Sequence, residues 1–167
     1  MGGSIYLNYS GILYTLLIAF CFFLKKKVNN NETKIYAVLV IITLLELFFG
    51  LIASYGILYL TNLFLLNIFV KSYFIVMLIW LTLFTIYILS ISKYKDGFYI
   101  KKSCKFTLIT SFIFCIFIIF SGLNFYNDNG NIFSEGIATV ILSIASCFLI
   151  IICIAYLNRK NFDKRYI

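Results

Sequence analysis

The sequence predicts an all-α fold, a polytopic bundle of transmembrane helices, and three observations lead to this prediction. Of the 167 residues, 63% are apolar or aromatic and only 12% are charged, and the mean hydropathy is +1.02. A soluble domain has about 45–50% apolar and about 25% charged residues. The apolar residues gather in five long runs, and lysines gather between the runs. This composition excludes a soluble globular domain, a disordered chain and a small disulfide scaffold.

Each of the five runs is long enough to form a helix that crosses a membrane. A hydrocarbon core of about 30 Å requires about 20 helical residues, and the runs lack the period-two alternation of membrane barrel strands. The linkers between the runs are short and polar, so residues 1–167 are expected to form a single transmembrane domain. The predicted spans are residues 6–24, 35–60, 68–92, 106–123 and 136–157.

The basic residues predict how these spans are oriented. With five spans, every Lys and Arg except Lys71 falls on the same side of the membrane. Short loops rich in Lys and Arg remain in the cytoplasm, so we expect the amino terminus outside and the carboxyl terminus in the cytoplasm. This split explains the net charge of +8 by topology and attraction to anionic lipid headgroups. The lipid bilayer is therefore an expected partner, and nucleic acid is not.

Tyrosines lie near the predicted span ends, which is typical of the belts that aromatic residues form at membrane interfaces. This pattern predicts that each of these side chains lies at a membrane surface. They are Tyr6, Tyr9, Tyr59, Tyr73 and Tyr126 on the outer side, and Tyr36, Tyr94 and Tyr156 on the inner side.

Glu46 is the main candidate for a functional residue. It stands within the second span with apolar neighbours on both sides. A carboxyl at this depth is costly, and such residues face the bundle interior or a polar cavity. One interpretation is a switch that responds to protons or a ligand, and the other is a protonated carboxyl that holds two helices together by a hydrogen bond.

Small residues follow Glu46 along one face of the second span. Small side chains spaced by four residues let helix backbones approach closely, so this face is expected to pack against another helix. A second stripe in the fifth span is a candidate partner, either within one chain or between two copies. The first stripe is Thr43, Glu46, Gly50, Ala53 and Ser54, and the second is Ala138, Ser143, Ala145, Ser146 and Cys147.

Three charged residues lie at the expected outer rim. Lys71 stands at the mouth of the third span, Asp128 in the last polar linker, and Glu135 at the start of the fifth span. They form an external site if Lys71 pairs with one of the acids. The alternative is that all three are solvated charges at helix ends, with Glu135 favoured by the helix dipole.

The chain offers no catalytic residues, no metal ligands and no cofactor-binding motif. It contains no histidine, which removes the commonest general base and metal ligand. Its five cysteines are dispersed and contain no C-x-x-C pair. We therefore expect a protein that is not an enzyme and that binds no cofactor.

Several short strings resemble a known family when they are taken together. They are Lys34-Ile35-Tyr36, the run from Trp80 to Tyr87, Asn129-Gly130 with Ser134 and Gly136, and Lys164-Arg165-Tyr166-Ile167. The chain resembles the amino-terminal polytopic membrane region, or input region, of bacterial two-component sensor histidine kinases. This resemblance implies a multi-pass protein of the bacterial cytoplasmic membrane that acts in signal transduction. The chain departs from the family because it lacks the histidine and the transmitter domain, so any kinase activity would belong to a longer parent.

The expected function is accordingly that of a membrane-embedded sensor or input module. It would signal by a shift between two packings of its helices, as a homodimer or with a fused or associated cytoplasmic signalling domain. Two alternatives stay open: a small transporter or channel subunit with Glu46 on a proton path, and a structural membrane protein without a ligand. The sequence shows neither a broken helix nor two equal halves, which are features of many transporters.

Overall fold

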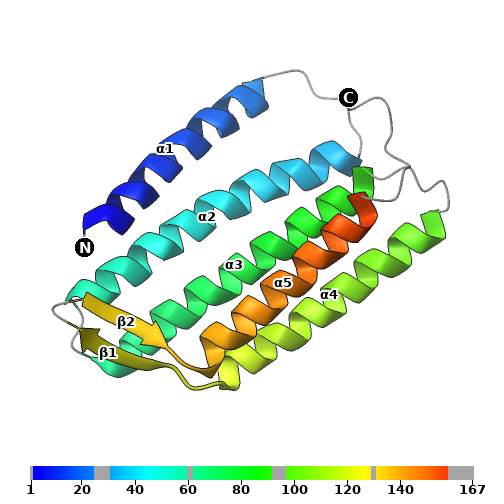
Figure 1. Cartoon of the computed structure of the whole chain (residues 1–167). Coiled ribbons are helices and arrows are strands. Elements are labelled where there is room, and N and C mark those ends of the chain that lie inside the picture. Colours follow the sequence, from blue (N-terminus) through cyan, green and yellow to red (C-terminus); the bar gives the residue numbers. More distant parts are fainter. Residues whose placement is uncertain (1, 25–30, 60–61, 92–96, 129–130, 158–167) are drawn as a thin grey trace.

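A computed structural model of the chain describes residues 2–24, 31–59, 62–91, 97–128 and 131–157. This described part consists of five helices and one β-hairpin (Figure 1). The elements are α1 (Gly2–Leu24), α2 (Asn31–Tyr59), α3 (Leu63–Ile91), α4 (Gly97–Phe120), β1 (Asn124–Asp128), β2 (Asn131–Glu135) and α5 (Ile137–Leu157).

The predicted helical membrane fold is confirmed, since α2, α3, α4 and α5 are each long and apolar enough to cross a bilayer. The chain is therefore a helical membrane protein. The first predicted span is also helical, as α1, and the apolar stretch described within it is Asn8–Leu24.

Four helices begin earlier than the predicted spans, and the differences are largest for α3 and α4. Helix α3 starts at Leu63 instead of residue 68, and α4 starts at Gly97 instead of residue 106. Hydropathy marks only the residues that face hydrocarbon, whereas backbone hydrogen bonding continues into the headgroup region, where lysine side chains extend toward water. The 29 residues of α3 give a length of about 43 Å at about 1.5 Å per residue, which exceeds the hydrocarbon thickness.

Helix α3 lies at the centre of the bundle. It packs against α2 on one side and against α4 and α5 on the other, and α4 and α5 also pack against each other (Figure 1). Helix α1 lies at the edge of the bundle and packs against α2. Many large apolar side chains of α1 are exposed, among them Leu13, Tyr14 and Phe20. These side chains form a surface suited to lipid.

A buried apolar cluster lies where α3 meets α4 and α5. Residues of α3 spaced by four form its centre, and small residues of α5 bring the two helices close together. Leu78, Ile118, Ala138 and Ala145 are fully buried. The cluster consists of Ala53, Leu66, Val70, Phe74, Leu78, Ile118, Leu123, Ala138, Leu142, Ala145 and Leu149.

Polar side chains also connect α3 with its two neighbours on this side. The hydroxyl oxygens of Thr82 on α3 and Ser111 on α4 are hydrogen-bonded at 2.7 Å. The Sγ of Cys153 on α5 lies 3.5 Å from the Oγ1 of Thr85 on α3. All four side chains are buried, so these contacts supply partners where lipid offers none.

The polar segment before α5 forms a β-hairpin, which the sequence analysis described only as a linker. Strands β1 and β2 pair antiparallel, from Asn124 opposite Glu135 to Asp128 opposite Asn131. The two residues between them in the sequence are Asn129 and Gly130, and an Asn-Gly pair is the strongest short-range hairpin signal. The hairpin lies at the end of the bundle where α2 ends and α3 begins (Figure 1); we call this the hairpin end.

Gly136 connects the hairpin to α5 in a conformation that other residues rarely adopt. Its φ is +150°, and a Cβ added there would lie 2.7 Å from the carbonyl oxygen of Gly122. The Gly136 carbonyl accepts hydrogen bonds from the backbone N–H groups of Thr139 and Val140, at 3.2 and 3.3 Å. Gly136 therefore fixes both the start of α5 and its contact with the end of α4.

We expect Gly136→Ala to lower the melting temperature of the purified protein, because the new methyl group meets a backbone oxygen that cannot move away cheaply. Strained backbone conformations of this kind cost on the order of 1–3 kcal/mol. The matched control is Gly122→Ala, since nothing lies within 4 Å of a Cβ at Gly122. Equal melting temperatures for the two variants in detergent would contradict this account.

Candidate functional site

The candidate site is centred on Glu46, which lies next to the midpoint of α2. The carboxyl group of Glu46 and the phenol of Tyr73 on α3 lie within interaction range of each other, so a hydrogen bond between them is available. Both side chains are half-buried. The costly carboxyl thus has a polar partner on the neighbouring helix, which is the arrangement expected of an ionisable group within a membrane.

Toward the end of the bundle opposite the hairpin, a second polar contact joins the same two helices. The Nε1–H of Trp80 on α3 donates to the Oγ1 of Thr43 at 2.8 Å, and Thr43 in turn donates to the carbonyl of Leu39 at 2.8 Å. Thr43 precedes Glu46 by three residues, so both lie on the face of α2 that meets α3. The two contacts therefore fix the register of α2 against α3.

Further along in the same direction, aromatic rings fill the space between α1, α2 and α3. The ring of Tyr36 lies 4.8 Å from that of Phe22 on α1 and 5.7 Å from that of Tyr87 on α3, measured between centroids. Such tilted and edge-on contacts are favourable for aromatic pairs. On this side of Glu46, the contact between the helices is therefore tightly filled by rings.

Toward the hairpin end, a polar cavity of about 230 Å³ lies next to Tyr73. Its walls come from four elements, α1, α2, α3 and β2, and combine amide and hydroxyl groups with small and apolar side chains. We call it the polar cavity, and its lining residues are Asn8, Gly50, Ala53, Ser54, Ile57, Val70, Tyr73, Phe74 and Ser134.

Gly50 makes this arrangement possible. It is buried, and a Cβ at this position would lie 3.3 Å from the Cε2 of Tyr73 and 3.5 Å from the Nδ2 of Asn8. One turn later, the hydroxyl of Ser54 donates to the carbonyl of Gly50 at 2.8 Å. The absence of a side chain at Gly50 thus lets α1 and α3 both place a polar side chain against α2.

The structure brings the predicted stripe on α2 together with α1 and α3 rather than with α5. Thr43, Glu46 and Gly50 contact α3, and Gly50 also lies close to Asn8 of α1. Helix α2 has its most extensive packing with α3. The helix partner suggested by the sequence therefore differs from the one found within a single chain.

The stripe predicted on α5 is split between two faces. Ala138 and Ala145 are fully buried against α3 and α4. Ser146 is half-buried, and Ser143 and Cys147 are exposed. The physical reason is the helical period, because residues two apart point about 200° from each other and cannot share a face.

Of the three charged residues of the predicted outer rim, the structure describes the side chains of Lys71 and Glu135. The Nζ of Lys71 donates to the carbonyl of Ile119 at 2.9 Å, in the last turn of α4, where a cation interacts favourably with the helix dipole. Glu135 is exposed at the end of β2. The backbone of Asp128 ends β1, while its side chain lies outside the described residues.

Tyr73 is the residue of the site that the sequence analysis placed differently. It was assigned to an interfacial belt, whereas the structure places it ten residues into α3 and within interaction range of Glu46. A predicted span that began at Leu63, where α3 begins, would have placed Tyr73 inside the span rather than near its end. Asn8 and Ser134 were also missed, because their role depends on elements far apart in the sequence meeting at one cavity.

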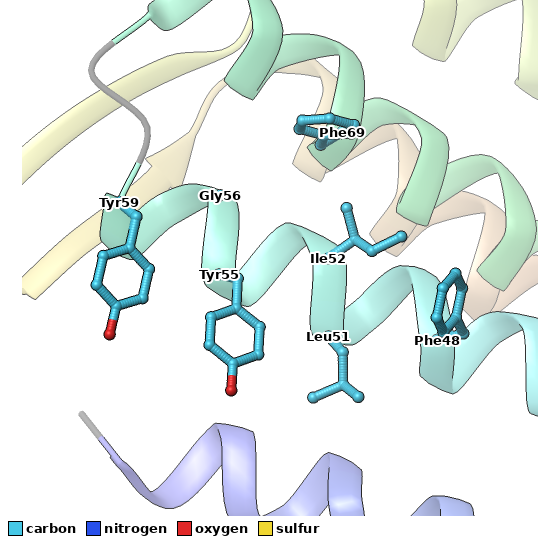
Figure 2. Close-up of a pocket in the computed structure, with 7 residues that line it drawn as sticks. All are labelled: Phe48, Leu51, Ile52, Tyr55, Gly56, Tyr59 and Phe69. Carbon is cyan, nitrogen blue, oxygen red and sulfur yellow. The ribbon is translucent and has the colours of Figure 1, made fainter.

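A second hollow near the hairpin end is an apolar groove of about 440 Å³. It is lined by residues of α2 and by Phe69 of α3 (Figure 2). The rings of Tyr55 and Tyr59 stack at 6.0 Å, and the hydroxyl of Tyr55 lies 2.9 Å from that of Tyr9 on α1. Its lining is Phe48, Leu51, Ile52, Tyr55, Gly56, Tyr59 and Phe69, and it shares no residue with the polar cavity.

The chemistry available to the Glu46–Tyr73 pair is hydrogen bonding and proton exchange. A phenol can donate to a carboxylate, and a protonated carboxyl can donate to a phenol. Among the described residues, no group of three or more His, Cys, Asp or Glu is placed to hold a metal ion. The pair can therefore act as a polar latch between α2 and α3.

Comparison with protein-family models, with curated proteins and with solved structures gives no match to this chain. The class of protein is thus defined by the structure itself, as a helical membrane protein with a polar contact and a cavity inside the bundle.

We expect Gly50→Leu to lower the melting temperature and to weaken the packing of α1 and α3 on α2. The longer side chain would displace Tyr73, and with it the hydrogen bond to Glu46. The matched control is Gly122→Leu, which enters open space. An unchanged melting temperature and an unchanged size-exclusion profile for Gly50→Leu, measured in detergent, would show that the close approach at Gly50 does not matter.

Proposed function

We propose that the chain is a membrane-embedded sensor or input module whose helices shift between two packings, with the Glu46–Tyr73 pair as the latch between them. The observation that supports this proposal most directly is the location of the pair. It joins α2 to α3 near the middle of both helices, next to a cavity that a small molecule or water can enter. A change at the cavity would therefore act on a contact that sets the register of two helices.

The surroundings of the pair favour sensing over transport. A transporter needs access to its central site from both sides of the membrane. Here the polar cavity lies on the hairpin side of Glu46, while the Trp80–Thr43 hydrogen bond and the rings around Tyr36 fill the opposite side. A site that can be approached from one side is suited to detecting a molecule rather than to passing it on.

The proposed setting is the cytoplasmic membrane of a bacterium, with five spans, the hairpin end outside and the opposite end in the cytoplasm. In this arrangement α1 crosses the membrane as the first span, in addition to α2, α3, α4 and α5, and the lysine-rich start of α4 faces the cytoplasm. A cytoplasmic signalling domain, fused or associated, would receive the signal in a two-component system, and the active form would be a homodimer. These proposals rest on the basic residues and on the family resemblance of the sequence.

The proposed orientation predicts which thiols a membrane-impermeant maleimide can reach. In a variant that keeps only Cys104, we expect labelling in lysed cells and none in sealed cells, because Cys104 lies near the start of α4. The control is Glu135→Cys in a cysteine-free background, which places an exposed thiol at the hairpin end and should be labelled in sealed cells. Labelling of Cys104 in sealed cells would overturn this topology.

The latch predicts that breaking the Glu46–Tyr73 hydrogen bond redistributes the chain between two helix packings. Spin labels at the exposed positions Val38 on α2 and Ile154 on α5 would report this by pulsed electron resonance in lipid nanodiscs. We expect Glu46→Gln to change the ratio of two distance populations about tenfold, which corresponds to about 1.4 kcal/mol.

The control for this experiment is Thr82→Val, which removes the hydrogen bond to Ser111 between α3 and α4. This bond lies outside the α2–α3 contact, so its loss should lower the melting temperature without moving the populations. A distance distribution that is the same in the wild type and in Glu46→Gln would show that the Glu46–Tyr73 pair is only a structural contact and not a latch. Proton uptake into proteoliposomes that depends on Glu46 would instead favour the transporter.

A further inference from the structure

The size and the lining of the polar cavity indicate which kind of molecule fits into it. The inference drawn from them rests on the sensing role proposed above. Its volume is about 230 Å³, enough for roughly seven water molecules at about 30 Å³ each. The occupant must therefore be small, of the size of an amine with a few carbon atoms.

The polar groups of the cavity are suited to a hydrogen-bond donor. Asn8 contributes an amide group, whose oxygen is an acceptor and whose nitrogen is a donor. The hydroxyl of Ser54 donates to the carbonyl of Gly50, so the Ser54 oxygen remains available as an acceptor. The rings of Tyr73 and Phe74 form another part of the wall. Aromatic faces attract cations, so acceptors and rings favour the same class of ligand.

The charges around the cavity favour a positive occupant. Among the described residues that line it, none is a lysine or an arginine. The nearby Lys71 follows the lining residue Val70 in the sequence, but its ammonium group is bound to the Ile119 carbonyl on α4. Glu46 does not line the cavity, but its carboxyl group interacts with the lining residue Tyr73, and its carboxylate would balance a cation at a site where a lone charge is costly.

The remaining walls are small and apolar. Ala53, Ile57 and Val70 line the cavity beside the polar groups, and a short alkyl chain would fill this part better than water. A hydrated metal ion would instead place its water molecules against these apolar side chains.

We propose that the polar cavity binds a small primary alkylammonium ion, which enters from the hairpin end. The ammonium group donates to Asn8 and Ser54 and lies against the ring of Tyr73, the alkyl chain contacts the apolar walls, and the Glu46 carboxylate balances the charge. Binding would bring a cation up to the Glu46–Tyr73 latch, so occupancy and helix packing would be coupled.

The test uses charged thiol reagents on a cysteine placed in the cavity. The variant Ser54→Cys, in a cysteine-free chain in lipid nanodiscs, is treated with two thiol reagents. One is 2-aminoethyl methanethiosulfonate, which is cationic, and the other is 2-sulfonatoethyl methanethiosulfonate, which is anionic. Each rate is divided by the rate of the same reagent with a free thiol. We expect the cationic reagent to react at least about tenfold faster, and we expect ethylammonium chloride, but not sodium chloride at the same concentration, to slow this reaction.

The matched control is Ser143→Cys on α5. Ser143 donates to the carbonyl four residues earlier, as Ser54 does, and lies at a similar distance from the hairpin end of its helix, but it is exposed on the lipid-facing surface. We expect it to react slowly with both reagents. Adding Glu46→Gln to Ser54→Cys should abolish the preference for the cation, whereas adding Tyr73→Phe, which keeps the carboxyl group, should retain a preference.

Four results would overturn the proposal: equal normalised rates, a faster anionic reagent, no reaction of Ser54→Cys, or no protection by ethylammonium. A preference that persists with Glu46→Gln would overturn the role given to Glu46. If Glu46→Gln does not fold, the Tyr73→Phe variant and the protection experiment still decide the outcome. The distance measurement with labels at Val38 and Ile154 uses no ligand, so failure of this inference and failure of the proposed function can be told apart.

Discussion

In a helix bundle surrounded by lipid, a polar side chain must find its partner inside the protein, and in this chain α3 provides most of those partners. In the described part of the chain, five residues of α3 each bind a polar group of a neighbouring helix. Lys71 and Thr82 bind groups of α4, Thr85 a group of α5, and Tyr73 and Trp80 groups of α2. The position of α3 at the centre of the bundle, in contact with α2, α4 and α5, makes these interactions possible.

The sequence predicts the helices well because the membrane imposes a simple rule on them. Apolar runs of about 20 residues must be helical, and α2, α3, α4 and α5 follow this rule. The exact ends are less predictable, as the early start of α4 at Gly97 shows. Hydropathy measures contact with lipid, and the helix continues where that contact ends.

The pairing of the helices could not be predicted in the same way. Glu46 and Gly50 were identified as the face of α2 that meets another helix, but α3 rather than α5 contributes the partner, Tyr73. Every span of such a protein is apolar on all sides, so hydrophobic patterning does not distinguish the face that meets a helix from the face that meets lipid. Only the polar and small residues carry that information, and they identify a face without identifying its partner.

The way in which α1 is held explains why the polar cavity lies where α1, α2 and α3 meet. Helices α3, α4 and α5 share a buried core and are joined by polar bonds, so a gap between them would lose both kinds of contact. Helix α1 packs mainly against α2 and contributes Asn8 to the cavity wall. A wall supplied by the least tightly held helix can move at low cost, while the Glu46–Tyr73 contact connects α2, against which α1 packs, to α3 in the rigid part of the bundle. The structure thus combines a movable side and a fixed side at one polar contact, which is the arrangement that a switch between two helix packings requires.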